Sequence, residues 1–292
     1  MKMQRGASTG LHTLFVEGKD GQEIDPVVMK ELLHNNGLTA IEVQAMGACD
    51  NVRSAAQALI KQHPSYYFLI DRDDQECSAV EQSWAKFPDP AAYNMLIWRK
   101  RELENYFIDP DYLGQSKYLK AGVDIRQRIL DECNRRLFLD AANLTLYALG
   151  RQLRKPLAIP HFADPLQFKN KQAGMSQLSQ LAGLVGKRAE VADILRQDTI
   201  EGIYARFVAE LSGGTLPLQY GLGTWLERMS GKEIFRVVAN ECFQVKTIAN
   251  EQLQGKEKYQ QIARDLVKLP LEQQPTDFQD IVGLLQARLG GF

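Results

Sequence analysis

The chain has 292 residues, of which 45% are hydrophobic and 24% are charged, and its formal net charge is -1. This composition is typical of a protein that buries a substantial core, and the overall charge gives no sign of a nucleic-acid binder, although a local basic patch stays open. No window reaches the about 18 uninterrupted apolar residues that a membrane span requires, and the first residues lack a signal-peptide pattern. We therefore expect a cytoplasmic protein with no membrane partner.

The cysteines give no sign of a structural zinc site or of a disulfide framework. Cys49, Cys77, Cys133 and Cys242 are far apart in the sequence, without CxxC spacing. The histidines lie near none of them in sequence, so the usual spacing of zinc ligands is missing.

From residue 11 to about 113, short β-prone apolar runs alternate with amphipathic stretches, a pattern typical of parallel strands joined by crossover helices. Strands are predicted at 11–16, 41–46, 66–70 and 94–98, and helices at 26–36, 51–62 and 77–87. Asp25 and Asp50 are placed as N-caps. The fold class is therefore predicted to be α/β, a Rossmann-like domain with a mainly parallel four-stranded sheet.

The alternation stops after Pro110, and helical spacing takes over. Helices are predicted at 124–149, 189–211, 232–244 and 257–269, with loops at 154–174 and along the glycines between 213 and 223. We therefore divide the chain into a catalytic domain, residues 1–113, and a mainly helical region, residues 114–292. Amphipathic helices there could serve equally as a substrate wall, a homodimer interface or a docking face for a partner.

Three acidic residues stand where the ligands of a parallel sheet bind. Glu17 follows the strand LHTLFV, and Asp71 follows the strand YYFLI, so both lie at the carboxyl edge of the predicted sheet. Asp73 is two residues beyond Asp71 and points the same way if the chain is extended there, while Arg72 faces elsewhere. Such carboxylates repel one another unless protons or a hard cation neutralise them, and oxygen ligands favour Mg²⁺. Alternatively, these aspartates merely cap turns.

Three segments, LFVEGKD, FLIDRDD and RKRELENYF, together resemble the TOPRIM domain. The last of them is similar to a segment of TOPRIM proteins of the overcoming-lysogenization-defect type and of their standalone relatives, such as the effectors of PARIS anti-phage systems. The resemblance implies a nuclease that cleaves phosphodiester bonds with Mg²⁺ or Mn²⁺, with Glu17 in acid or base catalysis and metal binding and with Asp71 and Asp73 as metal ligands.

The resemblance also implies further site residues. Glu104, with Glu102 as its neighbouring alternative, would complete a second metal site, although either could simply begin a helix. Related proteins carry an acid four residues after the glutamate, where this chain has Gly21, so Asp20 is the nearest substitute. A late lysine near the phosphate would match Lys232 of SGKEIF, a segment that equally reads as a turn and a helix start.

Basic residues near the acids could hold a nucleic-acid backbone, although ordinary solvated surface is the default for each. The candidates are Lys19, Arg72, Arg99 and Arg101, with Arg53 and Lys100 nearby.

No phosphate-binding loop of the form GxxxxGK[ST] is present, so the chain is not itself expected to be an ATPase of that class. Proteins of the family that the chain resembles work with an ABC-type ATPase, fused or separate. The resemblance thus implies the toxic effector of an anti-phage system, held inactive by a separate ATPase and acting on RNA, tRNA or DNA.

Two other functions stay open. A haloacid-dehalogenase-type phosphatase would use Asp71 as nucleophile and Asp73 as acid or base, which accounts for FLIDRDD but not for VEGKD. A non-catalytic TOPRIM module would bind nucleic acid or a protein without cleavage, although intact Glu17, Asp71 and Asp73 argue against degeneracy.

Overall fold

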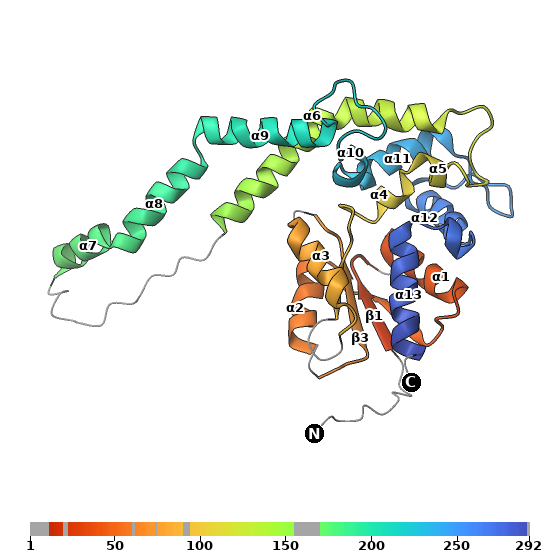
Figure 1. The fold of residues 1–292 in the computed structure, drawn as a ribbon, viewed down its shortest axis with the longest axis horizontal. Coiled ribbons are helices and arrows are strands. Elements are labelled where there is room, and N and C mark those ends of the chain that lie inside the picture. The colour runs from red at the N-terminus through yellow and green to blue at the C-terminus, as the bar shows by residue number, and fades with distance from the viewer. Residues whose placement is uncertain are drawn as a thin grey trace.

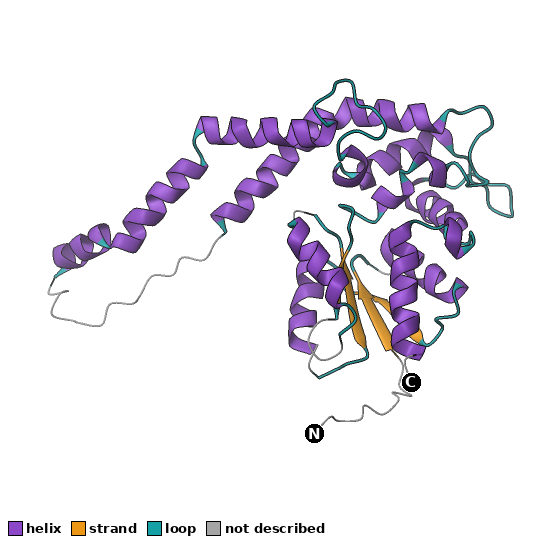
Figure 2. Ribbon diagram, viewed as in Figure 1, coloured by secondary structure: helices purple, strands orange, loops and turns teal. Residues whose placement is uncertain are grey.

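The computed structural model describes residues 12–19, 23–59, 62–73, 75–89, 94–154 and 170–290. Within them, β1 (His12–Val16), β2 (Ile41–Ala45), β3 (Tyr66–Ile70) and β4 (Met95–Ile97) form one parallel sheet in the order β2-β1-β3-β4 (Figure 2). The predicted α/β class with a parallel four-stranded sheet is confirmed. The strands also follow the predicted ranges, with β4 shorter than expected.

The strand order fixes where the sheet can bind a ligand. The chain passes from β1 to β2 on one side and then crosses over to β3 on the other side of β1. The topological switch point therefore lies between β1 and β3, which pair with Phe15 opposite Phe68. Both strands are largely buried, and β2 alternates buried and exposed residues as an edge strand does.

Three crossover helices join the strands: α1 (Ile24–Asn35), α2 (Cys49–Leu59) and α3 (Cys77–Lys86). Figure 1 shows α2 and α3 on one side of the sheet and α1 with the C-terminal helix α13 on the other. The prediction that Asp25 and Asp50 are N-caps is wrong, because both residues lie inside the first helical turn. The N-cap of α1 is Glu23, whose side chain makes no capping hydrogen bond.

The second half of the described chain is helical, as predicted. Its helices are α4 (Glu104–Phe107), α5 (Pro110–Leu113), α6 (Ile125–Leu153), α7 (Lys171–Gln180), α8 (Ala182–Ile194), α9 (Gln197–Ser212), α10 (Trp225–Arg228), α11 (Gly231–Cys242), α12 (Gly255–Leu266) and α13 (Thr276–Gly290), with a 3₁₀ turn at Leu271–Gln273.

Two predictions about this half are corrected. The stretch 189–211 is not one helix, because the chain turns at Leu195 and Arg196 between α8 and α9. The predicted loop at 154–174 is helical at its end, where Asn170 caps α7 by accepting from the backbone N–H of Ala173. Residues 155–169 of that loop lie outside the described residues.

The end of α6 together with α7, α8 and α9 extends away from the rest of the protein, whereas α12 and α13 return to the sheet (Figure 1). Phe278 of α13 packs on Trp98, which follows β4, with ring centroids 5.6 Å apart. The predicted division at residue 113 therefore marks a change of secondary structure, while one hydrophobic core includes residues from both sides of it. Across the described residues, no helix is both long and apolar enough to cross a membrane.

Candidate functional site

Glu17 and Asp71 lie side by side at the switch point, just beyond β1 and β3. The Glu17 Oε1 atom accepts a hydrogen bond of 2.8 Å from the backbone N–H of Asp71. The Cys49 thiol, at the start of α2, lies near the Glu17 carboxylate, whose charge helps to raise the pKa of the thiol after the larger effect of burial. Asp71 is 7% exposed, and its Oδ1 atom accepts from the backbone N–H of Leu103 at 3.2 Å. Backbone contacts thus orient both carboxylates.

Asp73 reaches the site by a route that differs from the expected one. Its φ of +46° places it in a left-handed turn rather than in an extended chain, and its N–H donates to the carbonyl oxygen of Arg101 at 3.0 Å. Asp71 and Asp73 therefore do not align as residues of an extended strand, contrary to the prediction. Asp73 is still close enough to raise the pKa values of Glu17 and Asp71 by charge repulsion, after the larger effect of burial.

Glu104, the first residue of α4, contributes a buried carboxylate. It is 4% exposed, and its Oε2 atom has no hydrogen-bond partner. Burial raises its pKa to about 8, and repulsion from Asp25 adds to the effect. An unpartnered buried carboxylate oxygen is costly, so this atom calls for a proton or a cation.

Asp25 belongs to the same cluster, although sequence reasoning assigned it only a capping role. It is 8% exposed in the first turn of α1, and burial raises its pKa to about 7, with Lys232 opposing that shift and Glu17 adding to it. A usable signal was present in the sequence. The helix that follows β1 must begin at the same sheet edge as Glu17, so an acid in its first turn faces the same region.

Lys232 is the cation of this cluster. Attraction to Glu104, and then to Asp25 and Asp71, raises the pKa of its ammonium above the ordinary value, so it stays charged. We name Glu17, Asp25, Asp71, Asp73, Glu104 and Lys232 the acid cluster.

Glu102 holds the start of α11, and its charge also acts on Glu104 and Lys232 of the cluster. Its Oε2 atom accepts from the backbone N–H of Lys232 at 2.7 Å, and the Ser230 hydroxyl donates to the same carboxylate. The two alternatives differ in their contacts, because the Glu104 Oε2 atom has no hydrogen-bond partner whereas Glu102 accepts from the first turn of α11.

Within the described residues, no three His, Cys, Asp or Glu side chains are already arranged around one point as metal ligands. The donor set nevertheless fits a hard cation, because every acidic member offers carboxylate oxygens. The unpartnered Glu104 Oε2 atom supports the same fit. Asp20, the other predicted ligand, lies outside the described residues.

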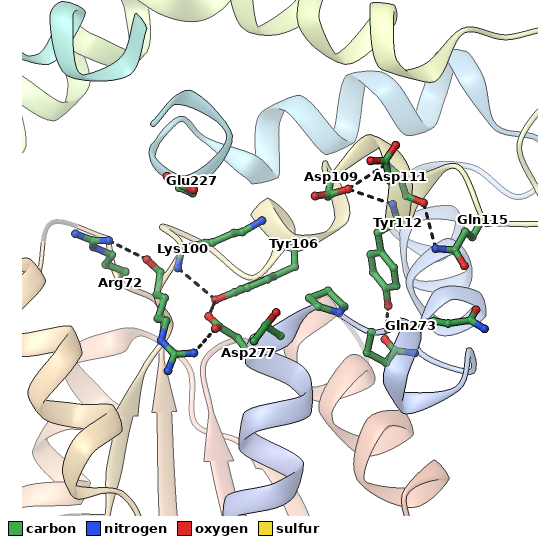
Figure 3. Close-up of a pocket in the computed structure, with 14 residues that line it drawn as sticks. Arg72, Lys100, Tyr106, Asp109, Asp111, Tyr112, Gln115, Glu227, Gln273 and Asp277 are labelled. Atoms are coloured by element: carbon green, nitrogen blue, oxygen red, sulfur yellow. Dashed lines mark hydrogen bonds and ion pairs between the residues drawn. The ribbon is translucent and has the colours of Figure 1, made fainter. Parts of the chain in front are cut away.

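The predicted nucleic-acid-binding residues do not share one surface. Arg72 is 8% exposed and donates to the carbonyl oxygen of Arg99 at 2.8 Å, and Arg101 is 5% exposed beside Glu102. Arg99 forms ion pairs with Asp277 and Asp280 of α13. Arg72 and Arg99 line a cavity of about 550 Å³ beneath α10 and α5, which includes neither Glu17 nor Asp71 (Figure 3). Lys19 is exposed.

No protein-family model, curated protein or solved structure significantly matches this chain.

Proposed function

We propose that the protein is a nuclease of the TOPRIM type, which cleaves phosphodiester bonds of nucleic acid with Mg²⁺ or Mn²⁺. The observation that carries this proposal is the buried Glu104 carboxylate oxygen without a partner, set among acids at the switch point of a parallel sheet. Five carboxylates with one lysine leave excess negative charge in a partly dry site, which divalent cations would compensate.

Glu17, Asp71 and Asp73 would hold one cation, and Asp25 with Glu104 would hold a second. A cation bound there polarises the scissile phosphate and lowers the pKa of a bound water. Lys232 would contact a phosphate oxygen, because its ammonium stays charged beside the acids. Burial raises the pKa of Glu17 above its ordinary value, a shift that suits a group acting as an acid or base.

We further propose that this activity is the toxic step of an anti-phage system in the cytoplasm, held in check by a separate ABC-type ATPase. The support is the resemblance of LFVEGKD, FLIDRDD and RKRELENYF, together with the extended helices α7 to α9, where exposed apolar residues such as Met175 and Val185 are suited to a partner or to a second copy.

The test is cleavage of labelled DNA, RNA and tRNA with and without Mg²⁺ by the wild type and by Glu17→Ala, Asp71→Asn and Glu104→Gln. The three variants should lose at least about 100-fold in rate, as removal of a group that stabilises transition-state charge does. Glu42→Gln, which changes an exposed acid on β2 of the same sheet, should cleave like the wild type. If Glu17→Ala, Asp71→Asn and Glu104→Gln all cleaved at the rate of the wild type and of Glu42→Gln, the proposal would be refuted.

The same preparations separate the two rival functions. A phosphatase would hydrolyse p-nitrophenyl phosphate and leave internal phosphodiester bonds intact, and it would depend on Asp71 but not on Glu104. A binding module would retain nucleic acid without cutting it under any metal condition.

A further inference from the structure

A second cavity, of about 300 Å³, opens beside the acid cluster. Glu104 and Lys232 of the cluster line it, and the remaining walls come from the starts of α1 and α12 and from α11. Its size is at the lower end of small-ligand sites in proteins. A phosphate held by Lys232 would therefore place its adjoining nucleotide at the mouth of this cavity.

An aromatic side chain in a fixed position forms one wall of the cavity. The Tyr259 hydroxyl accepts a hydrogen bond of 2.7 Å from the Asn240 Nδ2 atom, and the Tyr259 ring meets the buried Phe235 ring edge to face, with centroids 6.1 Å apart. Tyr259 itself is only half buried. Asn240 and Phe235 thus fix the orientation of the Tyr259 side chain, which stays partly exposed.

Two basic residues of the cavity wall differ in whether an acidic side chain already pairs with them. Arg236 is paired with Glu233 at 2.7 Å, so its guanidinium is already engaged. Lys256, in the first turn of α12, is exposed and has no hydrogen bond or ion pair from its side chain among the described residues. Lys256 is therefore the cation of this wall that is ready for an incoming phosphate.

We propose that this cavity is a subsite for the base of one nucleotide next to the phosphate that is cleaved, with Tyr259 stacking on the base and Lys256 contacting a neighbouring phosphate. The inference rests on the proposed function, because Glu104 and Lys232 connect the cavity to the cleavage site. Every base presents a π face to an aromatic ring, so this subsite tolerates different sequences but requires a base that is free of its own stack.

The test measures binding separately from cleavage. The Glu17→Ala protein is the parent for all variants, and the ligand is a short fluorescent oligouridylate in Mg²⁺. Adding Tyr259→Leu, which keeps an apolar side chain but removes the π face, should weaken binding at least about 5-fold, the lower end of one base stack. Tyr259→Phe loses the hydrogen bond to Asn240 but keeps the ring, and it should bind like the parent. Tyr147→Ala, which removes an exposed tyrosine on α6, is the matched control.

Lys256→Gln should reduce the slope of log affinity against log salt by about 0.7, the value expected for one lost phosphate contact on a single strand. Unchanged binding by Tyr259→Leu, or no binding of oligouridylate by the parent, would overturn the subsite. Equally weak binding by Tyr259→Leu and Tyr259→Phe would overturn the stacking role, because Tyr259→Phe keeps the ring. If the wild type cleaves nucleic acid with Mg²⁺ while the Tyr259 variants bind like the parent, only the subsite proposal is overturned. If binding depends on the Tyr259 ring but the wild type does not cleave, only the nuclease proposal is overturned.

Discussion

At the residue scale, Asp25 and Glu104 bind protons that the unfolded chain would have released. Their pKa values are about 7 and about 8, against ordinary values near 4, because both side chains are buried among other acids. Between about pH 4 and pH 8 the folded protein therefore holds more protons than the unfolded chain, so the free energy of unfolding falls as the pH rises. A bound divalent cation would replace those protons.

The first prediction concerns this pH dependence. In EDTA the melting temperature should fall from pH 5.5 to pH 8, whereas saturating Mg²⁺ should raise it more at pH 8 than at pH 5.5, because cations and protons compete for the same oxygens. Thermal melts at the two pH values, with and without Mg²⁺, measure both effects. A Mg²⁺ shift that is the same at both pH values would contradict the competition.

The second prediction concerns Asp25→Asn, which removes one acid at nearly constant volume. In EDTA at pH 8 the variant should be more stable than the wild type by about 1 kcal/mol or more, since one pKa unit corresponds to about 1.4 kcal/mol. Its stabilisation by Mg²⁺ should be smaller. Asp50→Asn, in the corresponding first turn of α2 but exposed, is the matched control and should change neither quantity. A destabilised Asp25→Asn protein would show that the charged carboxylate has a structural role.

The sequence predicted the approach of Glu17 to Asp71 because both residues directly follow strands, and parallel strands end at a common edge. It could not separate Glu102 from Glu104, because the chain between β4 and α4 is irregular and has no period that assigns side chains to a face. The left-handed φ of Asp73 was not predictable either, because it accompanies a hydrogen bond to Arg101, which is distant in the sequence.

At the element scale, the start of α11 is fitted closely against the turn that carries Glu104. The Asn105 Nδ2 atom donates to the carbonyl oxygens of Leu226 and Met229 at 2.9 and 3.0 Å. A Cβ atom on Gly231 would lie 2.5 Å from the backbone nitrogen of Asn105. The glycine therefore allows the two segments that carry Lys232 and Glu104 to meet.

The third prediction is that Gly231→Ala destabilises the protein by about 2 kcal/mol or more, because the methyl group meets backbone that cannot move aside. Metal-dependent cleavage should fall with it, as Lys232 is displaced from Glu104. Gly202→Ala in α9 is the matched control: a Cβ atom there meets nothing within 4 Å, so the change should stabilise the protein by about 0.5–1 kcal/mol. Urea unfolding measures the free energy of unfolding of both variants. If Gly231→Ala were as stable as the wild type, the close fit at Gly231 would be contradicted.

The strands and most helices could be predicted because apolar periodicity follows from which face is buried. The break between α8 and α9 could not, because Leu195 and Arg196 include neither glycine nor proline and the apolar spacing continues across them. The N-cap prediction for α1 failed for a different reason. An aspartate before a helical run usually caps it, but here Glu23 precedes α1, and Asp25 lies in the first turn, buried beside Glu17 and Lys232.

At the scale of the whole molecule, the C-terminal helices complete the sheet domain. Phe278 is fully buried and contacts Trp98, Tyr106 and Phe107, which lie between β4 and α5. The Asn35 side chain at the end of α1 donates to the carbonyl oxygen of Val267, just after α12. Residues 1–113 alone would expose these surfaces, so we expect the parts of the chain before and after α5 to unfold together.

The last prediction follows from this shared core. Phe278→Ala should lower the free energy of unfolding by about 3–5 kcal/mol, the usual cost of removing a buried phenylalanine, and the loss should appear on both sides of residue 113 at the same urea concentration. Phe138→Ala, which changes an exposed phenylalanine on α6, should stay within about 0.5 kcal/mol. The chain's three tryptophans report on both halves: Trp84 and Trp98 lie by the sheet, and Trp225 lies in α10. Variants that retain only Trp98 or only Trp225 should therefore give coincident transitions, whereas separate transitions would mean that the halves fold independently.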